Sequence, residues 1–355
     1  MIPPVMTPEA GLDPTRVICS TITLRNLPLD EALTAIAGLG FAEIDLGALP
    51  GVCDHVPYDL TEEAVEQVAR TVNASGLRVR SVNADVGDLN QPLDAGEETA
   101  RSTHVDRLIH LLTAIGAAGL VLPNGALSHE PITGLVPDLA LVADQVTGIA
   151  ERGAAAGVQL WIEAPHYFRL CYDLNRTAQL LALLPASVGV ICDVSHIVAS
   201  GSTPRRFVEL AGSRISHVHL RDAEPGYIHH SIGNGQVDFA DAIAALAQSG
   251  YGGAYSLELE TRDVNDSDRP AAALKAGRFI SALLGEGGAR TSVGRKPRSG
   301  GHVTDRLLER HERADLAITG WGGDLPSLGR SAVSEVRLTG MRAVVRREGI
   351  EPPTR

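Results

Sequence analysis

The feature that most constrains the fold is an alternation of short β-branched segments with longer helical segments across residues 16–287. Each β-branched segment is bounded by turn residues, and the segments between them carry helix start and stop signals. Strands that alternate with helices are typical of βαβ units and of a parallel sheet. The pattern therefore predicts an α/β protein.

Eight segments are predicted strands: 16–24, 42–46, 77–83, 119–122, 158–163, 188–193, 215–220 and 255–260. The predicted helices are 30–38, 61–75, 97–118, 137–156, 176–184, 240–248 and 270–284, the second of them capped by Thr61. Eight strands that alternate with helices over about 270 residues match the size of a (β/α)8 TIM barrel. An open doubly wound sheet usually needs a Gly-rich phosphate turn after its first strand, and residues 21–25 offer none. We therefore predict the barrel.

Composition excludes several classes of protein. Hydrophobic residues make up 44% of the 355, which is sufficient for a large core. No apolar run approaches the roughly 18 residues that span a bilayer, and residues 1–16 do not have the pattern of a signal peptide. The four cysteines are scattered without a CxxC pair and are typical of free thiols in a reducing cytosol. We therefore expect a cytoplasmic protein that has no membrane association.

Charge divides the chain near residue 287. The segment 288–355 has 13 basic and 8 acidic residues, a net charge of +5, which leaves −17 on residues 1–287. The junction is rich in Gly, Ser and Pro, as flexible linkers are. We predict a barrel domain over 1–287 and a Gly/Pro/Arg-rich extension of low order over 288–355. A basic interaction tail and read-through sequence are alternative interpretations of that extension.

Polar side chains end four successive predicted strands in one half of the barrel. They are Glu163, Asp193, His219 and Glu258. In TIM barrels the chemistry lies at the C-terminal ends of the strands, where these side chains would meet. Burying three carboxylates together is costly unless a cation neutralises them. Three carboxylates and one imidazole suit Mn²⁺ or Mg²⁺, and Co²⁺ or Zn²⁺ are alternatives.

Each of these residues also has a simpler interpretation. A single glutamate at a strand end is commonly a loop cap or a salt-bridge partner, and a single strand histidine is commonly structural. His217 is two residues before His219 and so lies on the same face of the strand. It is either a residue that supports the metal ligands or a core residue. Further candidates at the rim are Glu43, Asp45, Asn83 and Asp85, while Arg169 and Arg221 are candidates for binding an anionic group or for surface ion pairs.

Five ordered motifs carry a family resemblance: WIEAPH (161–166), ICDVSH (191–196), HVHLRDAEPG (217–226), SIGNGQVDF (231–239) and GYGGAYSLELE (250–260). Together they resemble the xylose-isomerase-like TIM barrels, which include sugar phosphate isomerases and epimerases, inosose dehydratases and an apurinic-endonuclease branch. The resemblance covers about 17–284 and is strongest from residue 158. It implies a divalent metal held by Glu163, Asp193, His219 and Glu258, and an acid/base role for Glu163 and Glu258.

The chemistry of such a site is proton transfer next to a carbonyl. A divalent cation stabilises the enediolate that forms, while two carboxylates remove and return the proton. His166 and His196 each follow a predicted ligand by three residues, so we expect them to contact substrate hydroxyls. Arg221 is a candidate for an anionic substrate group, and Asp222 is expected to orient a ligand or a loop. A tight loop over the site is expected at 233–235, rather than a phosphate-binding turn.

Departures from the family narrow the function. The apurinic-endonuclease branch resembles a three-metal design with an Asp-x-His pair, and residues 227–232 lack that aspartate. The missing aspartate and the net negative charge of the barrel domain together argue against a nucleic-acid partner. The sequence predicts a divalent-metal-dependent isomerase or epimerase of a small polyhydroxy carbonyl compound: a sugar, a sugar acid or a related polyol. A lyase acting on an inosose or a 3-oxo glycoside is the first alternative, and a non-catalytic binding barrel is the second. Barrels of this family often pair, so a homodimer stays open.

Overall fold

The chain folds into a closed barrel of eight parallel strands. In this computed structural model residues 11–292 are described, with side chains to residue 286. Around the barrel the strands are β1 (Val17–Ser20), β10 (Tyr255–Leu257), β7 (Ile215–Leu220), β6 (Gly189–Asp193), β5 (Gln159–Glu163), β4 (Gly119–Pro123), β3 (Arg78–Ala84) and β2 (Glu43–Ala48). Every neighbouring pair is parallel, and β2 pairs with β1 to close the ring. The predicted (β/α)8 architecture is confirmed.

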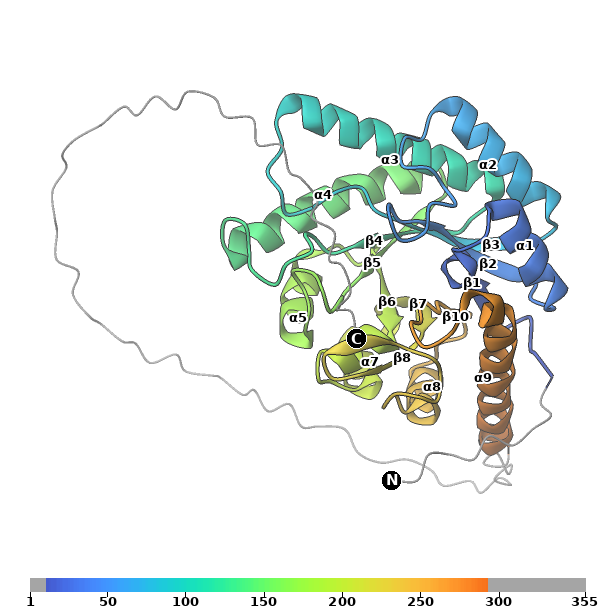
Figure 1. Cartoon of the computed structure of the whole chain (residues 1–355). Helices are drawn as coiled ribbons and strands as arrows, with labels where there is room; N and C mark the ends of the chain where they lie inside the picture. Colours follow the sequence, from blue (N-terminus) through green and yellow to red (C-terminus); the bar gives the residue numbers. More distant parts are fainter. Residues whose placement is uncertain (1–10, 293–355) are drawn as a thin grey trace, which may run out of the picture. The chain divides into compact units, whose positions relative to one another are not determined.

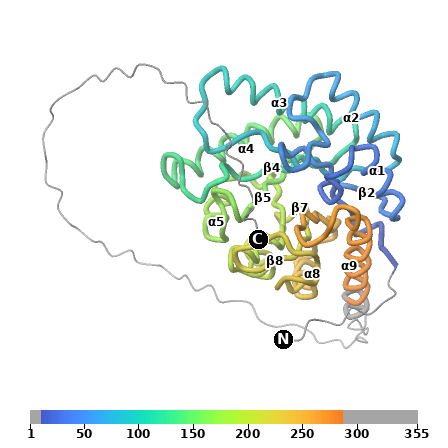
Figure 2. Tube along the Cα trace, viewed as in Figure 1, coloured from blue at the N-terminus to red at the C-terminus, as the bar shows by residue number. Residues whose placement is uncertain are grey.

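Helices surround this barrel (Figure 1). They are α1 (Leu29–Gly38), α2 (Glu62–Ala74), α3 (Ala95–Ile115), α4 (Leu135–Ala155), α5 (Leu174–Leu183), α6 (Val194–Ala199), α7 (Pro204–Ala211), α8 (Phe239–Gln248) and α9 (Arg269–Ser292), with 3₁₀ turns η1 (Thr21–Leu24), η2 (Gly212–Arg214) and η3 (Asp266–Asp268). The chain runs once around the barrel, so that α9 at the end of the described chain returns to the side of α1 (Figure 2). Thr61 caps α2 as predicted, because its side chain accepts a hydrogen bond from the Ala64 N–H.

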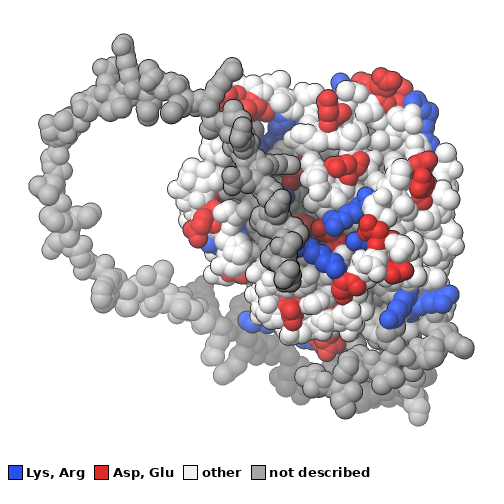
Figure 3. Space-filling model, viewed as in Figure 1, with Lys and Arg blue, Asp and Glu red and all other residues white. Residues whose placement is uncertain are grey.

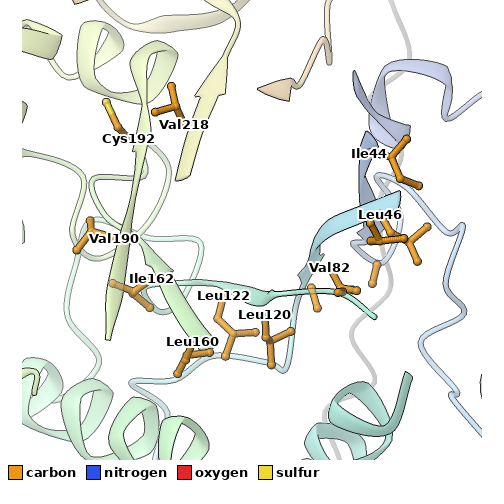
Figure 4. Packing of buried hydrophobic residues seen from close by; sticks show 14 of the residues in the cluster. Ile44, Leu46, Val82, Leu120, Leu122, Leu160, Ile162, Val190, Cys192 and Val218 are labelled. Atoms are coloured by element: carbon orange, nitrogen blue, oxygen red, sulfur yellow. The ribbon is translucent and has the colours of Figure 1, made fainter. Parts of the chain in front are cut away.

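Two apolar layers hold the barrel together. Outward-facing strand residues such as Leu120, Leu160 and Ile162 belong to the large core between the strands and the helices (Figure 4). Inside the barrel, Trp161 packs with Val121 and Ile191. Glycines on both neighbouring strands make room for the indole, since a Cβ at position 119 or 189 would lie 2.7 or 2.6 Å from it.

This inner layer determines where polar groups lie. Side chains alternate between the two faces of a strand, so the residue two positions after an inward-facing one also faces inward. Trp161 is therefore followed inside the barrel by Glu163, and Ile191 is followed by Asp193. The apolar layer forms the floor on which the polar site is built.

Several local features differ from the predictions, and helices α6 and α7 were not predicted at all. The first predicted strand, 16–24, ends at Ser20, whose side chain accepts from the Ile22 N–H and starts η1. The last predicted strand, 255–260, ends at Leu257, so Glu258 follows the strand. The segment after β7 forms an unpredicted antiparallel hairpin of β8 (Asp222–Glu224) and β9 (Tyr227–His230).

The predicted extension, 288–355, lies outside the described residues except for the last residues of α9. Its predicted character therefore stays a prediction. Among residues 11–292, no helix is both long enough and apolar enough to cross a membrane. On the face shown in Figure 3, acidic and basic side chains of the described residues are interspersed.

Candidate metal centre and active site

Four side chains converge at the C-terminal mouth of the barrel. Glu163 and Asp193 are the last residues of β5 and β6, His219 lies on β7, and Glu258 directly follows β10. One ligand atom from each lies within 4.8 Å of those of the other three. All four residues are at least 95% buried. The structure thus brings together the four residues that the sequence analysis selected as metal ligands.

The unpaired atoms of this cluster fit a cation. Glu163 Oε1, Asp193 Oδ2 and His219 Nδ1 are buried and have no hydrogen-bond partner among the described residues. His219 Nδ1 lies 3.6 Å from Glu163 Oε1 and 3.4 Å from Glu258 Oε2. Buried polar atoms are nearly always partnered, so several unpartnered atoms close together point to an ion that completes them. Three carboxylates and an imidazole are donors that suit a divalent metal.

The remaining oxygens of two ligands are held by hydrogen bonds. Asp193 Oδ1 accepts from the N–H and the hydroxyl of Ser195, at 2.7 and 2.6 Å, and so caps the unpredicted helix α6. Glu258 Oε1 accepts from the Asn83 side-chain amide at 2.8 Å. These bonds fix the two carboxylates so that their other oxygens stay available to a ligand.

The pKa values describe a cluster that retains protons without a metal. Burial raises the pKa of Glu163 to about 7, and the nearby charges of Glu258 and Asp193 add to the effect. Burial alone would lower the pKa of His219, but the carboxylates of Glu258 and Glu163 raise it well above its ordinary value. A divalent cation would replace these protons.

His166 and His196 stack beside the cluster as expected for groups that face a substrate. Their ring centroids are 3.9 Å apart, and both line a cavity of about 260 Å³ that also contains Glu163 and Glu258. Burial lowers the pKa of both imidazoles, and each is lowered further by a neighbouring positive charge. His196 Nδ1 accepts from the Tyr167 N–H at 3.0 Å, so the neutral ring carries its proton on Nε2.

Arg221 lines the same cavity, but most of its donors are already used. Its Nε and Nη2 point to the Ser195 hydroxyl at 3.3 and 3.1 Å, and its Nη1 lies 3.4 Å from Glu260 Oε2. Arg169 is paired similarly, with Nη2 at 2.7 Å from Asp85 Oδ2. Both arginines therefore brace the cavity wall, and binding of an anionic substrate group by Arg221 stays a prediction.

Asp222 is expected to orient either a ligand or a loop, and in the structure it orients a loop. Its carboxylate accepts the backbone N–H groups of Gly233, Gly235 and Val237 at 2.8 to 3.0 Å. Gly233 has φ +97°, and a Cβ on Gly235 would come within 2.4 Å of the Asp222 carboxylate. The SIGNGQVDF motif thus encodes a tight loop after the β8–β9 hairpin.

The remaining rim candidates separate into two groups. Glu43 lies at the start of β2 and pairs with Arg80 at 3.1 Å, so it is not at the rim. Asp45 lies deeper, 2.7 Å from His217 Nε2. Sequence alone ranked Glu43, Asp45, Asn83 and Asp85 equally. Glu43 and Asp45 are two residues apart and so share a face of β2, which means that alternation could not have separated them.

The sequence matches the family described as the xylose isomerase-like TIM barrel over residues 33–283. The chain belongs to this family. Its closed barrel and its motifs at strands β5 to β10 agree with that membership.

Curated relatives of this family member are dehydratases. The chain is 26% identical over 258 residues to the 3-dehydroshikimate dehydratase of Pseudomonas aeruginosa, covering 68% of this chain and 37% of that one. It is 25% identical over 158 residues to the inosose dehydratase of Lacticaseibacillus casei, covering 38% of this chain and 51% of that one. The chain therefore spans about half or less of the length of these relatives.

Solved structures show the same fold at lower identity. An L-ribulose 3-epimerase superposes with a TM-score of 0.64 and 18% identity, covering 80% of this chain and all of that one. The IolI protein with a binding zinc atom superposes with a TM-score of 0.63 and 17% identity, covering 76% of this chain and 98% of that one. The likeness shows that this chain and these proteins share the barrel fold.

Proposed function

We propose that this protein is a divalent-metal-dependent enzyme that moves a proton next to the carbonyl of a small polyhydroxy compound. The observation that carries the proposal is the convergence of Glu163, Asp193, His219 and Glu258, with unpartnered atoms, at the cavity in the barrel mouth. When bound there, a divalent cation would polarise the carbonyl and stabilise the enediolate. Mn²⁺ or Mg²⁺ is favoured by the three carboxylates, and Co²⁺ and Zn²⁺ are alternatives.

Glu163 and Glu258 are the proposed acid/base pair. Both line the cavity, and the Nδ1 atom of His219 lies between 3.4 and 3.6 Å from an oxygen of each. Burial raises the pKa of Glu163 to about 7, so this carboxyl can both accept and return a proton at physiological pH. Return of the proton to a neighbouring carbon, or to the other face, gives an isomerase or an epimerase.

His166 and His196 are proposed to bind substrate hydroxyls. Both are neutral near pH 7 because their pKa values are lowered, so each ring offers one N–H donor and one acceptor. A neutral imidazole can bind a hydroxyl group without attracting an anion from solvent. This arrangement suits an uncharged polyol better than a nucleic-acid backbone.

Dehydration is the second candidate function, and two observations favour it. Both curated relatives described above are named as dehydratases. In addition, His166 Nε2 lies 4.0 Å from Glu163 Oε2, so an imidazole nitrogen stands beside the proposed base. A donor in that place could protonate a departing hydroxyl after the same first proton abstraction.

Proton NMR in D₂O separates these reactions. The metal-loaded protein is incubated with ketoses, inososes and 3-oxo glycosides, with Glu258→Gln as the control variant. Deuterium next to the carbonyl in an otherwise intact carbon skeleton is expected for isomerisation or epimerisation, and loss of water identifies the dehydratase. If the panel gives no exchange and the protein binds none of the four metals, the barrel is a binding module and the proposal is wrong.

A further inference from the structure

We propose that Asp45 is a positioning residue that holds the imidazole of His219 with Nδ1 directed at the cation site. This inference rests on the proposed metal site. Asp45 lies on β2, on the opposite side of the His219 ring from the cluster. It belongs to a buried group that we call the aspartate support: Asp45, Ser81, His217 and His219.

Asp45 is held firmly inside the barrel. Its Oδ2 lies 2.7 Å from His217 Nε2, and its Oδ1 accepts the Ser81 hydroxyl at 2.7 Å. The side chains of Asp45, Ser81 and His217 are completely buried. Ser81 is the register partner of Asp45 across β2 and β3, so the pairing of two strands places this bond. A carboxylate fixed by two donors is a rigid reference for the ring that it faces.

The His219 ring lies between two sets of carboxylates. Its Nδ1 faces Glu163 and Glu258, whereas its Nε2 lies 3.7 Å from Asp45 Oδ2. A neutral imidazole carries one proton, and a carboxylate near Nε2 favours the tautomer that has its proton there. The lone pair of Nδ1 is then left for a cation. Support of this kind for a metal-binding histidine is a general feature of protein metal sites.

The aspartate support is not itself a second metal site. Atoms of Asp45, His217 and His219 lie within 4.8 Å of one another, as those of a ligand set would. However, the 2.7 Å between Asp45 and His217 is a hydrogen-bond distance, which leaves no room for an ion between them. Neither Asp45 nor His217 lines the cavity at the barrel mouth. The carboxylate therefore acts through His219.

Metal affinity tests the inference in Asp45→Asn. The variant keeps the shape of the side chain but removes the charge that favours the Nε2–H tautomer. We expect binding of Mn²⁺ and Zn²⁺, measured by competition with a chelator, to weaken about 10- to 100-fold. The matched control is Glu43→Gln, because Glu43 is a buried acid two residues earlier on the same strand that pairs with Arg80 instead. Its metal affinity is expected to stay within about twofold of wild type.

The tautomer of His219 is the second readout, and a merely structural role would not move it. Long-range ¹H–¹⁵N spectra of ¹⁵N-histidine-labelled, zinc-loaded protein distinguish Nδ1–H from Nε2–H, and His219→Gln identifies the signal. We expect Nε2–H in wild type and loss of that preference in Asp45→Asn. Equal affinity together with an unchanged tautomer would overturn the inference. Wild type that binds no divalent metal would instead overturn the proposed function.

Ser81→Ala keeps the inference testable if Asp45→Asn does not fold. It removes one of the two hydrogen bonds that hold Asp45 and leaves the carboxylate in place. A loosened carboxylate should weaken metal binding by a smaller factor, about two- to fivefold, with the Nε2–H tautomer kept. Wild-type affinity in Ser81→Ala, with Asp45→Asn unfolded, would count against a positioning role for this group.

Discussion

The two halves of this barrel use their inward-facing residues differently. Strands β5, β6 and β7 and the residue after β10 supply the four proposed ligands, three of which have buried atoms without a hydrogen-bond partner among the described residues. Strands β2 and β3 supply Asp45, Ser81 and Asn83, whose polar atoms bond to side chains inside the barrel. Both halves follow the same alternation of side chains. Under the proposed function, one half provides the reacting groups and the other orients two of them, His219 and Glu258.

The contact between the halves is specific. Asn83 on β3 donates to Glu258, and Asp45 on β2 faces His219, so each supports one ligand of the other half. Asp193 is instead fixed from its own half, by the N–H and the hydroxyl of Ser195. Removing a reacting group should therefore cost more activity than removing a support, and changes in the outer core should leave the site intact.

The largest effect is expected from Glu258→Gln and Glu163→Gln. Each substitution removes a proposed acid/base group and one anionic metal ligand. We expect kcat/KM for proton exchange to fall at least about 10³-fold, because general acid–base catalysis alone contributes 10²- to 10⁴-fold. Rates on the substrate identified by the D₂O panel measure this effect. If kcat/KM falls less than tenfold in both variants, Glu163 and Glu258 are not the acid/base pair.

A smaller effect is expected from Asn83→Ala, on the supporting half. Without the amide, Glu258 Oε1 loses its 2.8 Å hydrogen bond while the carboxylate remains. Metal affinity is expected to fall about tenfold, at the low end for groups that orient a ligand. The matched control is Asn90→Ala, since Asn90 is a buried amide that donates to Asp138 rather than to the cluster. An equal loss of metal affinity in both variants would mean that the effect comes from destabilisation.

Metal binding should release protons from the ligand half. The pKa of Glu163 is raised to about 7 and that of His219 is raised well above normal, so this pair holds at least one proton near neutral pH. A cation displaces it, and affinity should therefore weaken by roughly tenfold per pH unit for one proton as the pH falls from 8 to 6. Chelator competition at pH 6, 7 and 8 measures this slope. A pH-independent affinity would contradict the protonation of the pair.

The smallest effect on the site is expected from Leu120→Ala in the outer core. Leu120 is 1% exposed and belongs to the layer between strands and helices. The free energy of unfolding should fall by about 2–5 kcal/mol, as for other buried leucines, with metal affinity within about twofold of wild type. Thermal unfolding and chelator competition on the same sample check both values. A tenfold loss of metal affinity would show that the outer core also orients the site.

Much of this fold could be predicted from local sequence. The strands that carry Glu163, Asp193 and His219 are β-branched runs between turn residues, and a period of two places their ends on the inner face. Thr61 predicts the start of α2 because its side chain satisfies a free N–H of the first turn. These features depend only on neighbouring residues.

The rest depends on contacts between distant strands. The bond between Asp45 and His217 joins residues 172 positions apart, and the bond between Asn83 and Glu258 joins residues 175 apart. Such pairs are set by the tilt and stagger of the closed barrel, which the pattern of a single strand does not contain. The partners of Arg221 were missed for the same reason, since Ser195 lies in α6 and Glu260 lies in the segment after β10.

Anomalous X-ray diffraction from crystals of the Mn²⁺-loaded protein tests the central claim most directly. We expect a single anomalous peak within about 2.4 Å of donor atoms from Glu163, Asp193, His219 and Glu258, with Nδ1 as the histidine donor. A manganese ion bound elsewhere in the barrel, or held by only one of these four residues, would contradict the assignment of the reacting groups to strands β5, β6, β7 and β10.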